Sequence, residues 1–283
     1  MMKFLKNRVV FASALFGLLD FMQGFVIASP ILIYLRIIYE NTESSLHLWP
    51  LPSFEIFSDF MINHNDLFVL YIITAAVLYI LFFIIKSFFT GGIYRLIIYG
   101  RQNPLIIKTA KDFLKSSSEI WIGFLKVGIF GVLIYGLALF LGMIFGDFFG
   151  RFSGFLKFVI IALFLLLGST YLQILKIYIA STSDISLKAA MKETRGKISK
   201  AFMRILIGNI SVSAAAFAAV LILWFILKAL KSSEWSVILM ILTIAVQQLM
   251  VFAVCLGQSL RINFNYSVIK EGGENALGGD ELG

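Results

Sequence analysis

The sequence predicts an all-α fold: a polytopic membrane helix bundle with six transmembrane helices, both termini cytoplasmic, and additional amphipathic helices at the interface. Composition is the first observation behind this prediction, because 60% of the 283 residues are hydrophobic and 14% are charged. Soluble domains have roughly 45–50% apolar and about 25% charged residues. The second observation is the length of the apolar runs, since a helix needs about 20 apolar residues to cross about 30 Å of hydrocarbon.

Six apolar runs reach that length. They lie at about residues 9–36, 67–90, 120–145, 155–180, 202–229 and 235–262. The first run follows the basic segment MMKFLKNR and exceeds the roughly 7–15 apolar residues of a signal peptide, so we expect it to be a span. We expect one transmembrane domain over residues 1–270. The glycine-rich acidic tail at 271–283 has too few apolar residues to fold, and we expect it to be disordered.

The third observation is the distribution of charge between these runs. Most of the 24 Lys and Arg residues lie at the N-terminus, between the second and third runs from Lys86 on, between the fourth and fifth runs, and in the tail from Arg261 on. Segment 40–66, after the first run, instead holds acidic residues and no Lys or Arg. Basic segments stay in the cytoplasm. We therefore expect a multi-pass protein of the bacterial inner membrane with its N-terminus and C-terminus in the cytoplasm.

Segment 40–66 predicts a short amphipathic helix. Its apolar face holds Phe54, Phe57 and Met61, and Glu55 and Asp59 are turned away from that face. Such a helix lies on the membrane surface or folds back over the bundle. A lid that covers helix ends and a surface that binds a ligand both fit this pattern, and the sequence leaves the two open.

The chain has two histidines, His47 and His64, and both lie in this segment. A zinc site needs three or four ligands with defined geometry, whereas these two histidines are 17 residues apart. The chain also has one cysteine, Cys255, so a cysteine-rich metal site is excluded. We expect no metal and no cofactor.

Two basic segments between the runs share one organisation, an amphipathic helix with lysine and arginine on its polar face. In the first segment we expect Gly91 and Gly92 to loosen or end a helix, and Asn103-Pro104 to begin the next one. Such faces bind anionic lipid headgroups at the inner membrane surface or dock an acidic protein subunit, and no motif suggests nucleic acid. The docking candidates are Arg101, Lys108, Lys111 and Lys115 in the first segment, and Lys188, Lys192, Arg195, Lys197 and Lys200 in the second.

Within the first run, LFGLLDFMQGFV places Asp20 and Gln23 among apolar residues. Asp20 lies about 18 Å along the helix from Arg8, near the bilayer centre. An ionised side chain there costs on the order of 3 kcal/mol, so we expect it to face the bundle and to be paired or protonated. Candidate partners of suitable depth are Lys126, Tyr171, Gln173, Asn209, Gln247 and Gln248. Two roles stay open for the carboxylate: it bonds helices together, or it is a proton or substrate site.

Catalytic patterns are missing from the sequence. It contains no GxSxG, HExxH, GxGxxG or P-loop pattern, and the six apolar runs contain no histidine. We therefore expect no enzymatic activity.

Two segments, FFTGGIYRL at 88–96 and DISLKAAMKETRGK at 184–197, resemble in their layout a group of bacterial six-helix inner-membrane proteins. The group includes the membrane domain attached to some glycerophosphodiester phosphodiesterases. This resemblance implies an accessory role, because the phosphodiesterase chemistry of that group belongs to a separate soluble domain. We expect a non-enzymatic scaffold, accessory or assembly subunit of a membrane complex. The alternative is a small carrier or lipid-handling transporter with a polar intramembrane site around Asp20.

Overall fold

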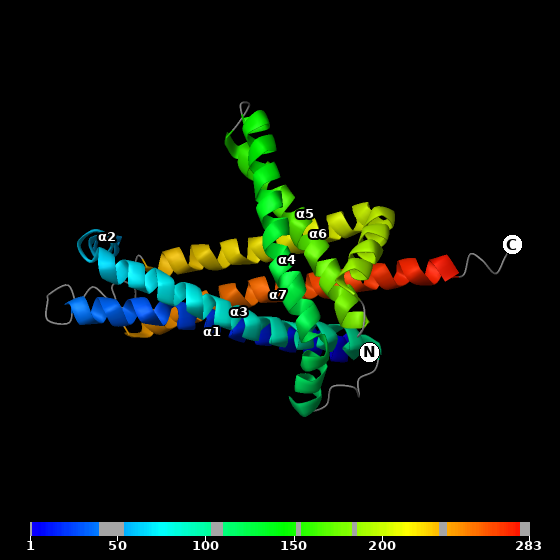
Figure 1. Cartoon of the computed structure of the whole chain (residues 1–283), viewed down its shortest axis with the longest axis horizontal. Coiled ribbons are helices and arrows are strands. Elements are labelled where there is room, and N and C mark those ends of the chain that lie inside the picture. Colours follow the sequence, from blue (N-terminus) through cyan, green and yellow to red (C-terminus); the bar gives the residue numbers. More distant parts are fainter. Residues whose placement is uncertain are drawn as a thin grey trace. The chain divides into compact units, whose positions relative to one another are not determined.

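The computed structural model describes residues 2–39, 54–102, 110–150, 154–182, 186–231 and 237–277. These residues form helices and, within the described ranges, no strand. The elements are α1 (Met2–Tyr39), α2 (Phe54–Asn63), α3 (Asn65–Gln102), α4 (Ala110–Gly150), α5 (Gly154–Ser181), α6 (Leu187–Lys231) and α7 (Val237–Leu277) (Figure 1).

The described residues contain six helices that are long and apolar enough to cross a membrane. Their spans are Arg8–Tyr39, Asn65–Tyr99, Lys111–Phe148, Gly154–Ser181, Ala201–Lys228 and Leu242–Lys270. The prediction of an all-helical protein with six spans is confirmed, and these helices indicate a multi-pass membrane protein. Which side of the membrane holds the termini stays a prediction.

The chain divides into two compact units. One comprises Leu18–Lys86, and the other comprises Met1–Gly17 with Ser87–Gly283. The smaller unit contains the second half of α1, all of α2 and the first half of α3. The larger unit contains the rest of α1 and α3, with α4 to α7.

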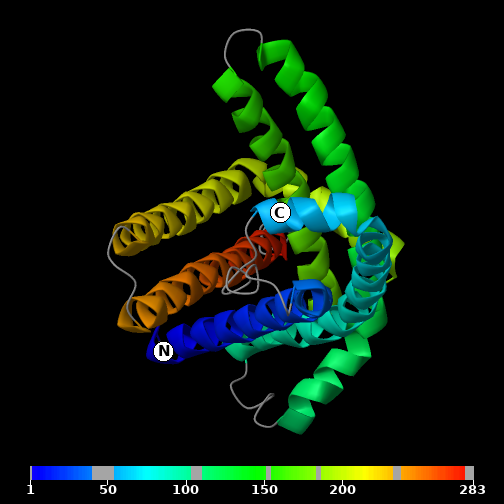
Figure 2. The same cartoon turned by 90° about the vertical axis from the view of Figure 1, so that its left-hand side faces the viewer.

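In the smaller unit, α2 covers the adjoining ends of α1 and α3. Phe60 of α2 is fully buried against Leu35 and Tyr39 of α1, and its ring meets Phe68 of α3 edge to face at 5.7 Å. The chain turns from α2 into α3 at His64 (Figure 2). This packing favours the lid interpretation of segment 40–66 and leaves its binding role as a prediction.

The predicted faces of α2 are corrected in two places. Met61, expected on the apolar face, is 42% exposed, and the neighbouring Phe60, which was not assigned to that face, is the residue that packs on α1. Asp59, expected to turn away, accepts a hydrogen bond from the hydroxyl of Tyr39. A ten-residue helix shows too few turns for its sequence alone to fix which residue faces the core. His47 lies outside the described residues.

In the larger unit, α3 does not end at Gly91 and Gly92, as the sequence suggested; it continues to Gln102. The two glycines instead allow α4 to approach closely. A Cβ on Gly91 would lie 3.1 Å from Ile120, and one on Gly92 would lie 2.7 Å from the ring of Phe113 and closer still to Ser117. Glycine at this contact therefore serves helix packing rather than helix termination.

The contact between α3 and α4 is also tied by charge. Nη1 of Arg95 forms an ion pair with the carboxylate of Glu119 and donates to the carbonyl of Ser116 at 3.2 Å. The guanidinium side chain is 5% exposed, whereas that of Glu119 is 44% exposed. The ion pair thus lies at the edge of the contact between α3 and α4, with the guanidinium of Arg95 on its buried side.

The remaining helices of this unit form two hairpins, α4 with α5 and α6 with α7, and α5 also packs on α6 and α7 (Figure 1). Ile174, Ile205 and Val268 form a buried core where α5, α6 and α7 meet. α6 bends at Ala201, whose backbone leaves the helical region at φ −118° and ψ 17°. The bend separates the basic segment 187–200 from the apolar span that follows.

Two further boundaries differ from the sequence predictions. Lys111 and Lys115 belong to the first turns of α4, which runs unbroken to Gly150, rather than to a separate amphipathic helix. α7 continues to Leu277, beyond the predicted end of the last run at residue 262, and part of the expected tail is helical. Residues 103–109 and 278–283, and with them Asn103, Pro104 and Lys108, lie outside the described residues.

Candidate functional site

The smaller unit holds a charged cluster formed by Asp20, Gln23 and Lys86. Nζ of Lys86 donates to Oδ1 of Asp20 at 2.6 Å and to Oε1 of Gln23 at 2.7 Å. Asp20 and Gln23 stand three residues apart in α1 and therefore share one helix face, and the long stem of Lys86 reaches them from α3. The side chain of Asp20 is 40% exposed and that of Lys86 is 32% exposed.

Sequence reasoning counted Lys86, near the end of the second run, with the basic segment that follows and so missed it as a partner of Asp20. The apolar part of α3 in fact continues to Tyr99. Lys86 lies 13 residues from that end, and Asp20 lies 12 residues from the Arg8 end of α1, so the two residues have matching depth in antiparallel helices. The matching depth of Asp20 and Lys86 follows from the sequence once the end of α3 is known.

This arrangement can act in two ways. A carboxylate and an ammonium in contact neutralise each other, which removes much of the penalty of placing charge among apolar helices. The ammonium also carries three donor hydrogens, of which the described contacts with Asp20 and Gln23 use two. The cluster is therefore suited to joining α1 and α3, and it is also the charged group that a carrier of protons or polar substrates needs.

A second polar cluster joins α5, α6 and α7 inside the larger unit. Nδ2 of Asn209 donates to Oγ1 of Thr170 at 3.2 Å, and Nδ2 of Asn265 donates to Oε1 of Gln173 at 2.9 Å. Nε2 of Gln173 donates to the carbonyl of Gln258 at 3.4 Å. Asn209 and Asn265 are fully buried. Neutral amide pairs of this kind bond spanning helices together.

Sequence reasoning found part of this second cluster. It selected Asn209 and Gln173 but considered them as partners of Asp20, whereas the structure gives them partners within the larger unit. Asn265 was missed because the last span was taken to end at residue 262, while the apolar part of α7 continues to Lys270. A longer span would have placed Asn265 within the membrane helix.

The other predicted intramembrane candidates lie on helix surfaces. Gln247 and Gln248 are exposed on α7, and Lys126 is exposed on α4. Among the predicted docking residues, Lys111, Lys115, Lys188, Lys192 and Arg195 are exposed. Arg101, Lys197 and Lys200 lie in helices, but their side chains are outside the description. In the part of the chain that is described, no group of three or more His, Cys, Asp or Glu residues could hold a metal.

Asp59 of α2 has an environment that favours its ionised form. Its carboxylate accepts hydrogen bonds from the hydroxyl of Tyr39 and from Nδ2 of Asn63, the latter at 2.6 Å. The bond from Tyr39 is the main cause, and the bond from Asn63 the second, of a pKa for Asp59 below its ordinary value of 3.8. The ionised carboxylate thus helps to attach α2 to α1.

We expect this attachment to depend on acid pH in a defined direction. Because the pKa of Asp59 is lower in the folded chain, its contribution is complete above pH 3.8 and is lost as the pH falls through the lowered value. Tyr39→Phe should raise the pKa of Asp59 and weaken this dependence, because the bond from Asn63 remains. Hydrogen–deuterium exchange of the α2 amides, corrected for the intrinsic effect of pH, measures both changes. Equal protection of α2 in the two proteins at every pH would contradict this assignment.

Comparison with known families, characterised proteins and solved structures finds no family model, protein or structure that matches this chain.

Proposed function

We propose that this chain is a non-enzymatic integral membrane protein that serves as a scaffold, accessory or assembly subunit of a membrane complex. The observation that carries the proposal is the surface of α6. In the most apolar 18-residue window of its span no residue is buried inside the chain, although α6 lies along α7. The corresponding window of α3 is 6% buried, and those of α1, α4, α5 and α7 are 22–28% buried.

The composition of this surface favours a helix partner over lipid. Ala214 and Ala218 stand one turn apart on the exposed face, and the large side chains of Ile222 and Phe225 follow on the same side, each 62% exposed. Small residues one turn apart let a second helix approach closely, whereas lipid tails gain nothing from them. We take this face, defined by Ala214, Ala218, Ile222 and Phe225, as the assembly face.

A photoreactive residue in native membranes tests the assembly face. Placed at Ala218, it should form a discrete crosslink to a protein, because a partner helix covers that position. Placed at Leu81 of α3, which is 54% exposed and has the large, exposed side chains of Val77 and Ile85 one turn away on the same face, it should label lipid only. Lipid labelling alone at both positions would contradict the proposal.

The second candidate function is a small carrier or lipid-handling transporter. It is favoured by the contact between Asp20 and Lys86, since ionisable residues inside spans mark proton and substrate pathways. The two functions differ in what Asp20 must do. A subunit needs the ion pair for stability, whereas a carrier needs the carboxylate to bind or release a proton.

A further inference from the structure

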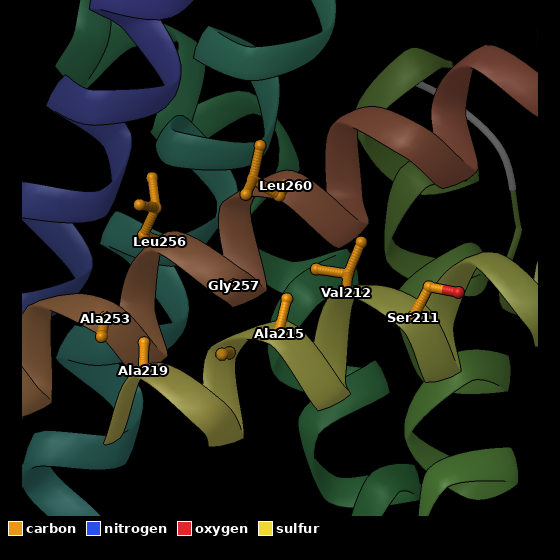
Figure 3. Close-up of a pocket in the computed structure, with 9 residues that line it drawn as sticks. Ser211, Val212, Ala215, Ala219, Ala253, Leu256, Gly257 and Leu260 are labelled. Carbon is orange, nitrogen blue, oxygen red and sulfur yellow. The ribbon is translucent and has the colours of Figure 1, made fainter. Parts of the chain in front are cut away.

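α6 and α7 cross at Ala216 and Gly257, with a groove on each side of the crossing. A Cβ on Gly257 would lie 2.8 Å from that of Ala216, so the two backbones are close there. One groove encloses about 350 Å³, and Figure 3 shows that the short side chains of Ala215, Ala219 and Ala253 leave it open. Its lining is almost wholly apolar.

The groove on the other side encloses about 260 Å³, and the polarity of its lining changes along its length. Because α6 and α7 are antiparallel neighbours, Ser213 lies near Gln258 and Arg261, whereas Val220 lies near Val254. About 10 Å of helix separates the two ends. The groove therefore has a polar, cationic end and an apolar end. We call it the Arg261 groove.

Arg261 is the residue of this groove that indicates a bound ligand. Its Nη1 donates to Oγ of Ser213 at 3.4 Å, and no carboxylate among the described residues pairs with it. An unpaired guanidinium between spanning helices is unfavourable. An anion at the same end of the groove would complete its hydrogen bonds and neutralise its charge.

The depth of Arg261 suits a lipid headgroup. The apolar part of α7 has 29 residues, which at 1.5 Å each is about 43 Å, close to the full thickness of a bilayer with its headgroups. On that scale Arg261 lies about 7 Å inside the hydrocarbon boundary nearer Lys270, a depth from which an arginine side chain reaches the interface. A lipid in that leaflet has its phosphate within reach of the guanidinium and its acyl chains beside the apolar end.

We infer that the Arg261 groove binds an anionic membrane phospholipid. Its phosphate contacts Arg261 and Ser213, and one acyl chain lies along Phe217, Val220 and Val254. A neutral helix of a partner would cover the apolar end but leave the guanidinium without an anion. A soluble anion would satisfy the guanidinium but leave the apolar end empty. A lipid with a negative headgroup fits both ends.

Lipid titration of the purified protein, followed by native mass spectrometry, tests this inference. The probes are phosphatidylglycerol and phosphatidylcholine with identical acyl chains. We expect the wild-type protein to bind phosphatidylglycerol more tightly. Arg261→Gln should weaken that binding about tenfold, which corresponds to about 1.4 kcal/mol, and should leave phosphatidylcholine binding unchanged. Lys126→Gln removes the same charge at an exposed site of α4, outside the groove, and should have no effect.

A second variant tests the apolar end independently. Val254 is 55% exposed, so Val254→Trp can fill the groove without overpacking the core and should weaken binding of both lipids. Equal binding of the two lipids by the wild-type protein, or unchanged phosphatidylglycerol binding in Arg261→Gln, would overturn the inference. A protein that retains no lipid but forms a dimer sensitive to Val254→Trp would also overturn it, since the groove would then hold a second copy.

Discussion

Lys86→Leu and Asp20→Leu should each destabilise the protein by on the order of 2–3 kcal/mol. Either change leaves a single charge inside apolar helices, and insertion of one charged residue at mid-membrane costs about that much. The partial exposure of both side chains, 40% for Asp20 and 32% for Lys86, places the expected value at the lower end of that range. The double variant Asp20→Asn with Lys86→Gln removes both charges and should cost less than the two single changes together.

A double-mutant cycle of Asp20→Asn, Lys86→Gln and their double variant in detergent, with the free energy of unfolding as the readout, measures this coupling. We expect a coupling energy between Asp20 and Lys86 above about 1 kcal/mol. Lys126→Leu is the matched control, because Lys126 is an exposed lysine of α4 and its removal should change stability little. Additive effects at Asp20 and Lys86, within about 0.5 kcal/mol, would show that the ion pair does not hold α1 and α3 together.

The same variants separate the two candidate functions. If the ion pair only stabilises the fold, the double variant Asp20→Asn with Lys86→Gln keeps the activity of the complex to the extent that it keeps the fold. If Asp20 is a proton site, that variant loses pH-dependent transport in reconstituted vesicles while the fold stays intact. A folded variant with unchanged transport would remove the carrier from consideration.

Gly92→Ala is the second change for which we expect a large effect. The added Cβ would lie 2.7 Å from the ring of Phe113 and closer still to Oγ of Ser117. Ser117 cannot move aside freely, because its hydroxyl donates to the carbonyl of Phe113 at 2.9 Å. Forcing a methyl group into such a contact costs about 1–3 kcal/mol, and more where the helices must separate.

Thermal unfolding and a disulfide crosslink between α3 and α4 report on this contact. Gly92→Ala should lower the unfolding temperature and the crosslinking yield. Gly136→Ala is the control, since a Cβ on Gly136 meets nothing within 4 Å and alanine favours the helix by about 1 kcal/mol. A Gly92→Ala protein as stable as the Gly136→Ala protein would contradict the close approach of α3 and α4.

Hydropathy and length were enough to predict the spans, because a helix must satisfy its own backbone in lipid whatever its neighbours are. The ends of the helices were less predictable. Gly91 and Gly92 suggested the end of a helix, but they lie where α3 contacts α4. This role depends on Phe113 and Ser117 of α4, which the local sequence around the glycines does not include. The last run was taken to end at residue 262 for the same reason, since polar residues inside a long helix, such as Arg261 and Asn265, resemble the end of a span.

The candidate sites were predictable as residues but not as pairs. Asp20 and Asn209 are conspicuous in apolar runs, and Arg261 is not, because it stands among other polar residues. Lys86 is the partner of Asp20 because of the way α1 and α3 align. Hydropathy gives no information about that alignment. The face of α2 also required the structure, since Phe60 and Met61 are equally apolar and only packing selects Phe60.

In our proposal the chain works as a subunit of a membrane complex. Gentle extraction from native membranes followed by native mass spectrometry tests it most directly. We predict a stoichiometric protein companion that is lost when Ala218 on the assembly face is replaced by tryptophan, because a bulky side chain prevents the close approach of a partner helix. A lone chain without any protein companion, both in the wild-type and in the Ala218→Trp protein, would contradict the account.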